Sequence, residues 1–84
     1  MTRAARRDRL LGFLETIRRP GVPLSAIGES ANLVQAGLVD SLAILQIIEF
    51  LESEFGIDFR TTAVDPTQLT TIPSILDLIE AHGR

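Results

Sequence analysis

The sequence predicts an all-α fold, a small bundle of four helices of which three are long and one is short. Three separate stretches repeat apolar residues every three or four positions, the period of a helix with one buried face. No stretch shows the two-residue alternation that is typical of a half-buried strand. At 84 residues the chain is near the size where one hydrophobic core just suffices, so we expect one domain over residues 1–84.

The first helix is predicted over residues 3–19. Its apolar stripe has spacings of three and four residues and consists of Leu10, Phe13, Leu14 and Ile17. Residues 1–19 also hold six arginines against two acids. We expect these arginines to form a solvated helix face, and a nucleic-acid surface is the alternative interpretation. Pro20 should end the helix, because proline cannot continue it and disfavours helical geometry in the residue before it.

A long loop is predicted over residues 20–40. It is longer than most connections in compact domains, so it should be functional or anchored by its own apolar side chains. A short helical turn is expected around residues 24–27, and the four candidate anchors are Leu24, Ile27, Leu33 and Leu38. Gly37 marks either an ordinary turn or a close approach of the backbone to a partner.

The second long helix is predicted over residues 41–55. At ~100° per residue, one side collects the expected core stripe Ile44, Ile47, Ile48, Leu51 and Phe55. The opposite side collects Gln46, Glu49, Glu52 and Ser53. Leu42 and Leu45 fall beside Glu49 and Glu52 instead of in the core stripe. An exposed apolar pair ringed by carboxylates has the composition of a docking surface, although isolated exposed leucines are also common.

The C-terminal third predicts two further helices. Gly56 should end the second helix as a left-handed cap, and Asp65-Pro66 should begin a short helix over residues 66–69. The last helix is predicted over residues 72–82, capped by Thr70 or Thr71. Its buried stripe should comprise Ile72, Ile75, Leu76 and Ile79. His82 falls in the last turn, where it is expected to be solvated or to pair with the helix terminus.

Composition excludes several classes of protein. The chain has no cysteine and one histidine, so a disulfide framework, a catalytic thiolate and a zinc site are excluded. No apolar run is long enough for a membrane span, and the arginine-bearing start lacks the apolar core of a signal peptide. We therefore expect a cytoplasmic protein. Residues 20–84 carry nine acids against two arginines, which makes this part of the chain acidic.

The stretch Gly37-Leu38-Val39-Asp40-Ser41-Leu42 places one hydroxyl where the long loop becomes a helix. Either Asp40 or Ser41 has the side-chain oxygen to cap the first turn, which is the simplest interpretation of the pair. Together with Leu51-Glu52-Ser53-Glu54-Phe55-Gly56-Ile57, however, the stretch resembles the acyl and peptidyl carrier proteins. The Asp-Ser-Leu serine of that family bears 4′-phosphopantetheine, and the resemblance runs from about Leu33 to the end.

The resemblance implies a carrier that performs no chemistry itself. A phosphopantetheinyl transferase would attach 4′-phosphopantetheine from coenzyme A to Ser41, and Asp40 would help to position metal and transferase. The thiol of the arm would hold an acyl or aminoacyl group as a thioester. Leu42, Leu45, Glu49 and Glu52 would then dock partner enzymes weakly and transiently. The expected form is a monomer, free of nucleic acid, that passes its cargo to a downstream acyltransferase or synthase.

Within the family, Gly-Leu-Val-Asp-Ser-Leu and the stretch from Asp65 to Ile72 look most like D-alanyl carriers and similar stand-alone carriers, which adenylate-forming ligases load. Ala43, Ile44, Leu45 and Gln46 stand where fatty-acid carriers commonly have acids. A carrier for fatty-acid or polyketide synthesis is the alternative within the family. A small nucleic-acid-binding or protein-interaction module is the alternative of another class. A serine hydrolase is disfavoured, because the chain's one histidine lies three residues from its end.

Overall fold

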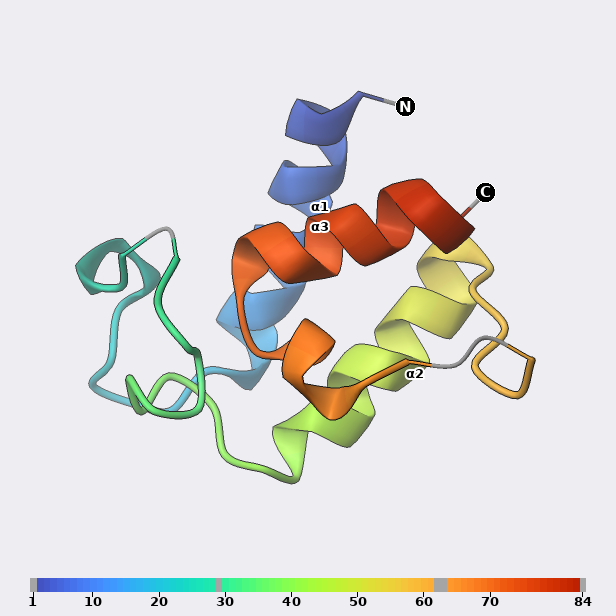
Figure 1. The fold of residues 1–84 in the computed structure, drawn as a ribbon. Helices are drawn as coiled ribbons and strands as arrows, with labels where there is room; N and C mark the ends of the chain where they lie inside the picture. The colour runs from blue at the N-terminus through green and yellow to red at the C-terminus, as the bar shows by residue number, and fades with distance from the viewer. Residues whose placement is uncertain (1, 29, 62–63, 84) are drawn as a thin grey trace.

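The computed structural model describes residues 2–28, 30–61 and 64–83, which form three α-helices and two short 3-10 helices (Figure 1). In chain order these are α1 (Arg3–Ile17), η1 (Leu24–Ala26), α2 (Ala43–Phe55), η2 (Pro66–Leu69) and α3 (Ile72–His82). The described residues contain no strand, and the predicted all-α class is confirmed. The predicted short helix is the 3-10 helix η2, so the count is three α-helices and not four.

The core lies where the three α-helices meet. Each contributes apolar side chains that are buried: Leu10 and Leu14 from α1; Ala43, Ile47, Leu51 and Phe55 from α2; Ile72, Ile75, Leu76, Leu78 and Ile79 from α3. In α2 the stripe is rotated slightly from the predicted one. Ala43 is buried, whereas Ile44 and Ile48 are only partly buried at its edge.

Helix α1 ends two residues before the predicted position. Arg18 already has an extended backbone (φ −64°, ψ 151°), and the backbone N–H of Arg19 donates to the carbonyl oxygen of Leu38 at 2.7 Å. A bond to the distant loop therefore replaces the next helical bond. The end of α2 agrees with the prediction, because Gly56 adopts a left-handed conformation (φ 68°) and its N–H donates to the carbonyl oxygens of Glu52 and Leu51.

Side-chain caps fix the start of both C-terminal helices. The Asp65 carboxylate accepts from the Thr67 N–H, and the Asp65 N–H donates to Gln68 Oε1, both at 2.9 Å. The Thr67 backbone N–H, followed by its hydroxyl, holds the pKa of Asp65 below its usual value. Of the two threonines considered for α3, Thr71 is the cap, since its Oγ1 accepts from the Ser74 N–H at 3.2 Å.

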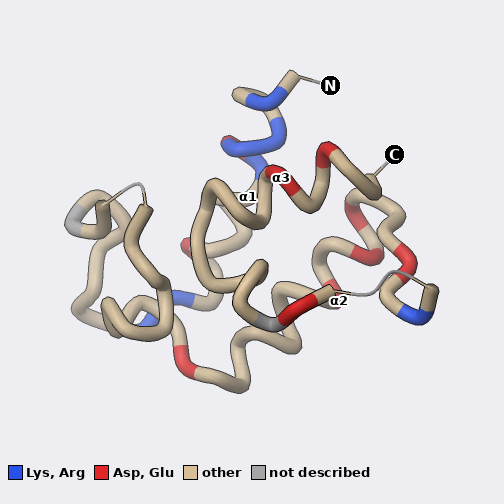
Figure 2. Tube along the Cα trace, in the orientation of Figure 1, with Lys and Arg blue, Asp and Glu red and all other residues tan. Residues whose placement is uncertain are grey.

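Arginines of α1 tie this helix to the other two. Arg3 lies 3.0 Å from both Asp77 and Glu80 of α3, and Arg9 pairs with Glu54 of α2. Figure 2 shows the basic turns of α1 and the acidic positions on α2 and α3. These side chains are partly exposed, so each pair contributes only weakly to stability. The expected solvated face is therefore partly a set of intramolecular contacts.

Replacing a buried and an exposed leucine of α2 tests this arrangement. Leu51 is fully buried, so Leu51→Ala should lower the free energy of unfolding by about 2–5 kcal/mol. Leu45 is 59% exposed, and Leu45→Ala should change the free energy of unfolding by less than about 0.5 kcal/mol. Urea denaturation followed by circular dichroism measures both. Equal losses for the two variants would show that the buried face of α2 is assigned wrongly.

Candidate functional site

The loop before α2 is held in place by buried side chains and by backbone hydrogen bonds. Leu33, Leu38 and Val39 are fully buried. The N–H of Leu33 donates to the Thr70 carbonyl at 2.7 Å, and the N–H groups of Leu38 and Val39 donate to the Leu33 carbonyl at 3.0 and 3.3 Å. Two of the predicted anchors, Leu33 and Leu38, are thus confirmed. The burial of Val39 could not be predicted from the sequence, because a single buried residue in a loop has no periodicity.

Gly37 provides the turn within this anchored loop. Its backbone has φ +80°, a left-handed conformation that glycine adopts without steric cost, and its N–H donates to the Val34 carbonyl at 3.1 Å. A Cβ at this position would meet nothing within 4 Å. The backbone conformation, and not a lack of space, is therefore what favours glycine, and the turn interpretation is the one that the structure supports.

Asp40 caps the entrance to α2. Its Oδ1 accepts a hydrogen bond from the Ala43 N–H at 2.9 Å, and its carbonyl oxygen accepts from the same N–H at 3.1 Å. Residues 41 and 42 form a turn, and α2 begins at Ala43 instead of at Ser41. The regular helix thus begins two residues after the predicted start, because residues 41 and 42 form the turn that the Asp40 carboxylate closes.

Ser41 lies in that turn with its side chain exposed. Among residues 2–28, 30–61 and 64–83 its hydroxyl has no hydrogen-bond partner, because Asp40 already serves as the cap. By contrast, the hydroxyls of Ser53 and Ser74 donate to backbone carbonyls. The turn thus presents the oxygen of Ser41 to solvent at a position that is fixed on both sides, by buried Val39 before it and by buried Ala43 after it.

The other four residues expected at the site all lie on the exposed face of α2 or just before it. Leu42 and Leu45 are 72% and 59% exposed, the two large apolar side chains that are exposed in the described part of the chain. Glu49 and Glu52 are exposed as well. The spacings of four and three residues from Leu45 to Glu49 and on to Glu52 place these side chains along one helix face. Ser41 therefore adjoins one end of an apolar and acidic strip.

Comparison with known families identifies this arrangement. The family model described as the phosphopantetheine attachment site matches residues 15–81, more than half of the chain. The chain belongs to this family, the phosphopantetheine-binding carrier proteins. Neither the search of curated proteins nor that of solved structures found a match.

Family membership defines the cofactor and the general role. The domain is an attachment site for covalently bound 4′-phosphopantetheine, and carrier domains of this kind are not catalytic. They interact with a phosphopantetheinyl transferase and with the enzymes that use the bound arm. No helix in the described part of the chain is long and apolar enough to cross a membrane.

The assignment of the cap to Asp40 leads to a test by substitution. Asp40→Ala should lower the free energy of unfolding by about 1 kcal/mol, and Asp40→Asn by less, because asparagine also accepts the bond. Ser41→Ala should leave the free energy of unfolding unchanged within about 0.5 kcal/mol, since its hydroxyl makes no bond to another described residue. Urea denaturation of the three variants provides the comparison. A loss confined to Ser41→Ala would assign the cap to Ser41 instead.

Proposed function

We propose that this protein is an acyl or aminoacyl carrier whose Ser41 bears 4′-phosphopantetheine. One observation carries the assignment: Asp40 accepts the capping bond of α2, and the adjacent Ser41 hydroxyl remains exposed and unbonded among the described residues. The match to the attachment-site family includes this position. The residues present fit the cofactor, because an exposed primary hydroxyl is the group that forms a phosphate ester.

The loading reaction requires only a nucleophilic oxygen from this chain. Ser41 Oγ forms a bond to the phosphorus that carries the pantetheine arm of coenzyme A. The diphosphate P–O bond breaks, adenosine 3′,5′-bisphosphate leaves, and the hydroxyl proton passes to a base of the transferase. Asp40 uses one carboxylate oxygen for the cap. Its second oxygen is the group by which it would help to position magnesium and the transferase.

The carrier has no need of an internal base. When bound, the cofactor supplies a thiol that holds an acyl or aminoacyl group as a thioester. A hydrolase would instead need a histidine bonded to Ser41, but within the described part of the chain His82, in the last turn of α3, makes no hydrogen bond to Ser41. Ser41 thus acts as the substrate of another enzyme and then as a fixed attachment point.

We propose that Leu42, Leu45, Glu49 and Glu52 form the docking strip for partner enzymes. The two leucines supply a small apolar contact of the kind that keeps an encounter short-lived. The carboxylates steer basic partner surfaces toward the strip, an effect that acts mainly on the association rate. Such weak docking suits a monomeric carrier, because the carrier must release each partner in turn.

An adenylate-forming ligase is the loading enzyme that we propose. In the first turns of α2, Leu45 and Gln46 are exposed where fatty-acid carriers commonly have acids, so residues 43–46 contribute no charge to the surface beside Ser41. This supports a stand-alone carrier of the D-alanyl type over one for fatty-acid or polyketide synthesis. A downstream acyltransferase or synthase would then receive the cargo.

The nucleic-acid alternative loses support from the structure. Binding to phosphates needs a basic surface available to the partner. Arg3 and Arg9 instead pair with acids of α3 and α2, and Arg18 pairs with Glu15. The exposed strip beside Ser41 is apolar and acidic, which nucleic acid would avoid.

Modification by a transferase is the direct test of the proposed function. Incubation with coenzyme A, magnesium and a broad-specificity phosphopantetheinyl transferase should add one phosphopantetheinyl group, located at Ser41 by peptide fragmentation. Ser41→Ala should accept none while keeping its fold, and Ser25→Ala, which changes another exposed serine, should be modified normally. An unmodified wild type, or a modified Ser41→Ala, would disprove the carrier assignment.

The docking strip makes a second prediction about the same reaction. Leu45→Ala and Glu49→Lys should each lower the kcat/KM of modification, by about threefold to tenfold. For Glu49→Lys the deficit should shrink as salt is added, because screening weakens the wild-type attraction as well. Asp8→Lys makes the same charge change at an exposed position of α1 and is the matched control. Equal effects of the two lysine variants would show that overall charge matters and the strip does not.

A further inference from the structure

One hydrogen bond ties the loop before Ser41 to the junction between η2 and α3. The Leu33 N–H donates to the Thr70 carbonyl oxygen at 2.7 Å. The Leu33 carbonyl in turn accepts from the N–H groups of Leu38 and Val39, and Val39 lies two residues before Ser41. The position of the Thr70 carbonyl is therefore one of the constraints that determine where the backbone of Ser41 lies.

Thr70 is the single residue between the end of η2 and the cap of α3. Its backbone is helical (φ −103°, ψ −11°), whereas that of Thr71 is extended (φ −128°, ψ 152°). The chain thus changes conformation at the peptide group that carries the Thr70 carbonyl. The direction of this carbonyl depends on the dihedral angles on both sides, so it stays fixed only if both sides are held.

The Ser74 side chain connects the two sides of this turn. Its hydroxyl donates to the Gln68 carbonyl in η2 at 2.9 Å, with the Thr71 carbonyl also within reach at 3.0 Å, and it accepts from Thr71 Oγ1 at 2.7 Å. The start of α3 does not need this hydroxyl, because Thr71 Oγ1 already accepts the Ser74 N–H as its cap. The bond to Gln68 instead fixes the turn that contains Thr70.

Asp65 holds the same turn from the η2 side. Its carboxylate accepts from both the N–H and the hydroxyl of Thr67 at 2.9 Å. The Thr67 carbonyl then accepts from the Thr70 hydroxyl at 2.7 Å and from the Thr70 N–H at 3.4 Å. Thr70 therefore has bonded neighbours on both sides, Thr67 before it and the pair of Thr71 and Ser74 after it.

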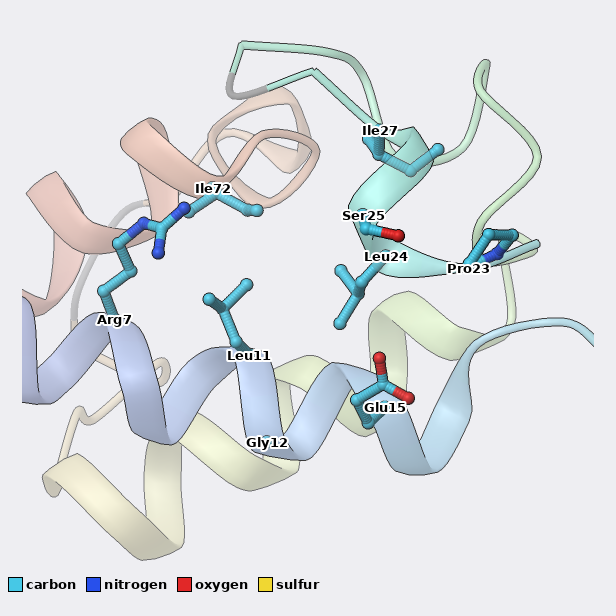
Figure 3. A pocket seen from close by; sticks show the side chains of 9 residues that line it. All are labelled: Arg7, Leu11, Gly12, Glu15, Pro23, Leu24, Ser25, Ile27 and Ile72. Atoms are coloured by element: carbon cyan, nitrogen blue, oxygen red, sulfur yellow. The ribbon is translucent and has the colours of Figure 1, made fainter.

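Packing is incomplete where the start of α3 faces α1 and η1. Ile72, the first residue of α3, lines a pocket of about 620 Å³ there (Figure 3). The pocket is also lined by apolar residues, by a glycine and by polar side chains, among them Leu11, Leu24, Gly12, Arg7 and Ser25. Because side chains leave this space unfilled, the hydrogen bonds of the junction contribute more to the position of the start of α3.

We propose that Ser74 is a positioning residue for the modification of Ser41, an inference that rests on the proposed carrier function. The Ser74 hydroxyl holds the Thr70 carbonyl where the Leu33 N–H bonds to it, and Leu33 holds the backbone just before Ser41. Without this hydroxyl, the loop spends part of its time in arrangements that the transferase does not bind. The apparent affinity of the transferase for the carrier falls by that fraction, and the reaction within the bound complex is unchanged.

Steady-state modification by the transferase, with coenzyme A, magnesium and the carrier as the varied substrate, tests this role. Ser74→Ala should raise the KM for the carrier about threefold with kcat unchanged, as for a loop that is correctly placed about one third of the time. Ser74→Thr keeps the hydroxyl and should restore the wild-type KM. Asp65→Ala removes the bonds on the η2 side at an exposed position and should raise the KM as well.

Thr2→Ala is the matched control, because it removes a capping hydroxyl from α1 and leaves the junction intact. Thr2 Oγ1 accepts from the Ala5 N–H at 3.1 Å. This variant should keep the wild-type KM. Amide hydrogen exchange gives a second readout: the Leu33 amide should exchange about threefold faster in Ser74→Ala and at the wild-type rate in Thr2→Ala, and the Ala5 amide should show the reverse.

A wild-type KM in Ser74→Ala, with the wild type modified at Ser41, would overturn this inference and leave the carrier function standing. An equal rise of KM in Thr2→Ala would also overturn it, since lost stability would then explain the effect. So would a Ser74→Thr variant as impaired as Ser74→Ala. If Ser74→Ala does not fold, the KM of Asp65→Ala decides in the same way. Failure of the wild type to be modified at all would overturn both proposals.

Discussion

The hydrogen bond from the Ala43 N–H to the Asp40 carboxylate is the constraint on which the site depends. A helix start leaves several backbone N–H groups without partners, and a nearby side-chain oxygen commonly satisfies one of them. Here the acid does so, although the serine beside it has a suitable oxygen too. Because Asp40 forms the cap, Ser41 keeps an exposed hydroxyl on a backbone that is anchored on both sides.

The backbone at Ser41 is anchored by the loop as well as by α2. Leu33, Leu38 and Val39 are buried, and the Leu33 carbonyl accepts from the N–H groups of the other two. The Leu33 N–H in turn reaches the Thr70 carbonyl just before α3. A substitution that removes one of these buried side chains should therefore change the position of Ser41, although Ser41 itself is unaltered. The same cluster joins the end of α1 to the turn through the bond from Arg19 to Leu38.

The charged side chains differ in whether they are paired within the molecule or exposed to a partner. The arginines near the start of α1 are used within the molecule, where Arg3 and Arg9 pair with acids on α3 and α2. Glu49 and Glu52 lie beyond these contacts and keep the exposed face of α2 acidic. A chain with a formal net charge of only −3 thus has two exposed carboxylates on the face of α2 that adjoins Ser41. The positions of the surface charges affect the steering of a partner more than the net charge does.

Periodic features could be predicted from the sequence, whereas features set by tertiary contacts could not. The exposure of Leu42 and Leu45 followed from the helical wheel, and the left-handed Gly56 followed from the end of the apolar repeat. The regular helix α2 begins two residues after the predicted start, because sequence alone does not show that residues 41 and 42 form a turn closed by the Asp40 carboxylate. The burial of Val39 and the pocket beside Gly12 depend on chain segments far apart in sequence, so no local sequence pattern predicts them.

Nuclear magnetic resonance of the modified protein tests the central claim most directly. With ¹³C and ¹⁵N labelling, attachment of 4′-phosphopantetheine should shift the Ser41 Cβ signal and couple it to phosphorus. The Ala43 amide should exchange with solvent no faster than before modification, because its bond to Asp40 does not involve Ser41. Phosphorus coupling at any other residue would contradict the account. So would faster exchange of the Ala43 amide after modification, since the cap and the attachment point would then not be separate groups.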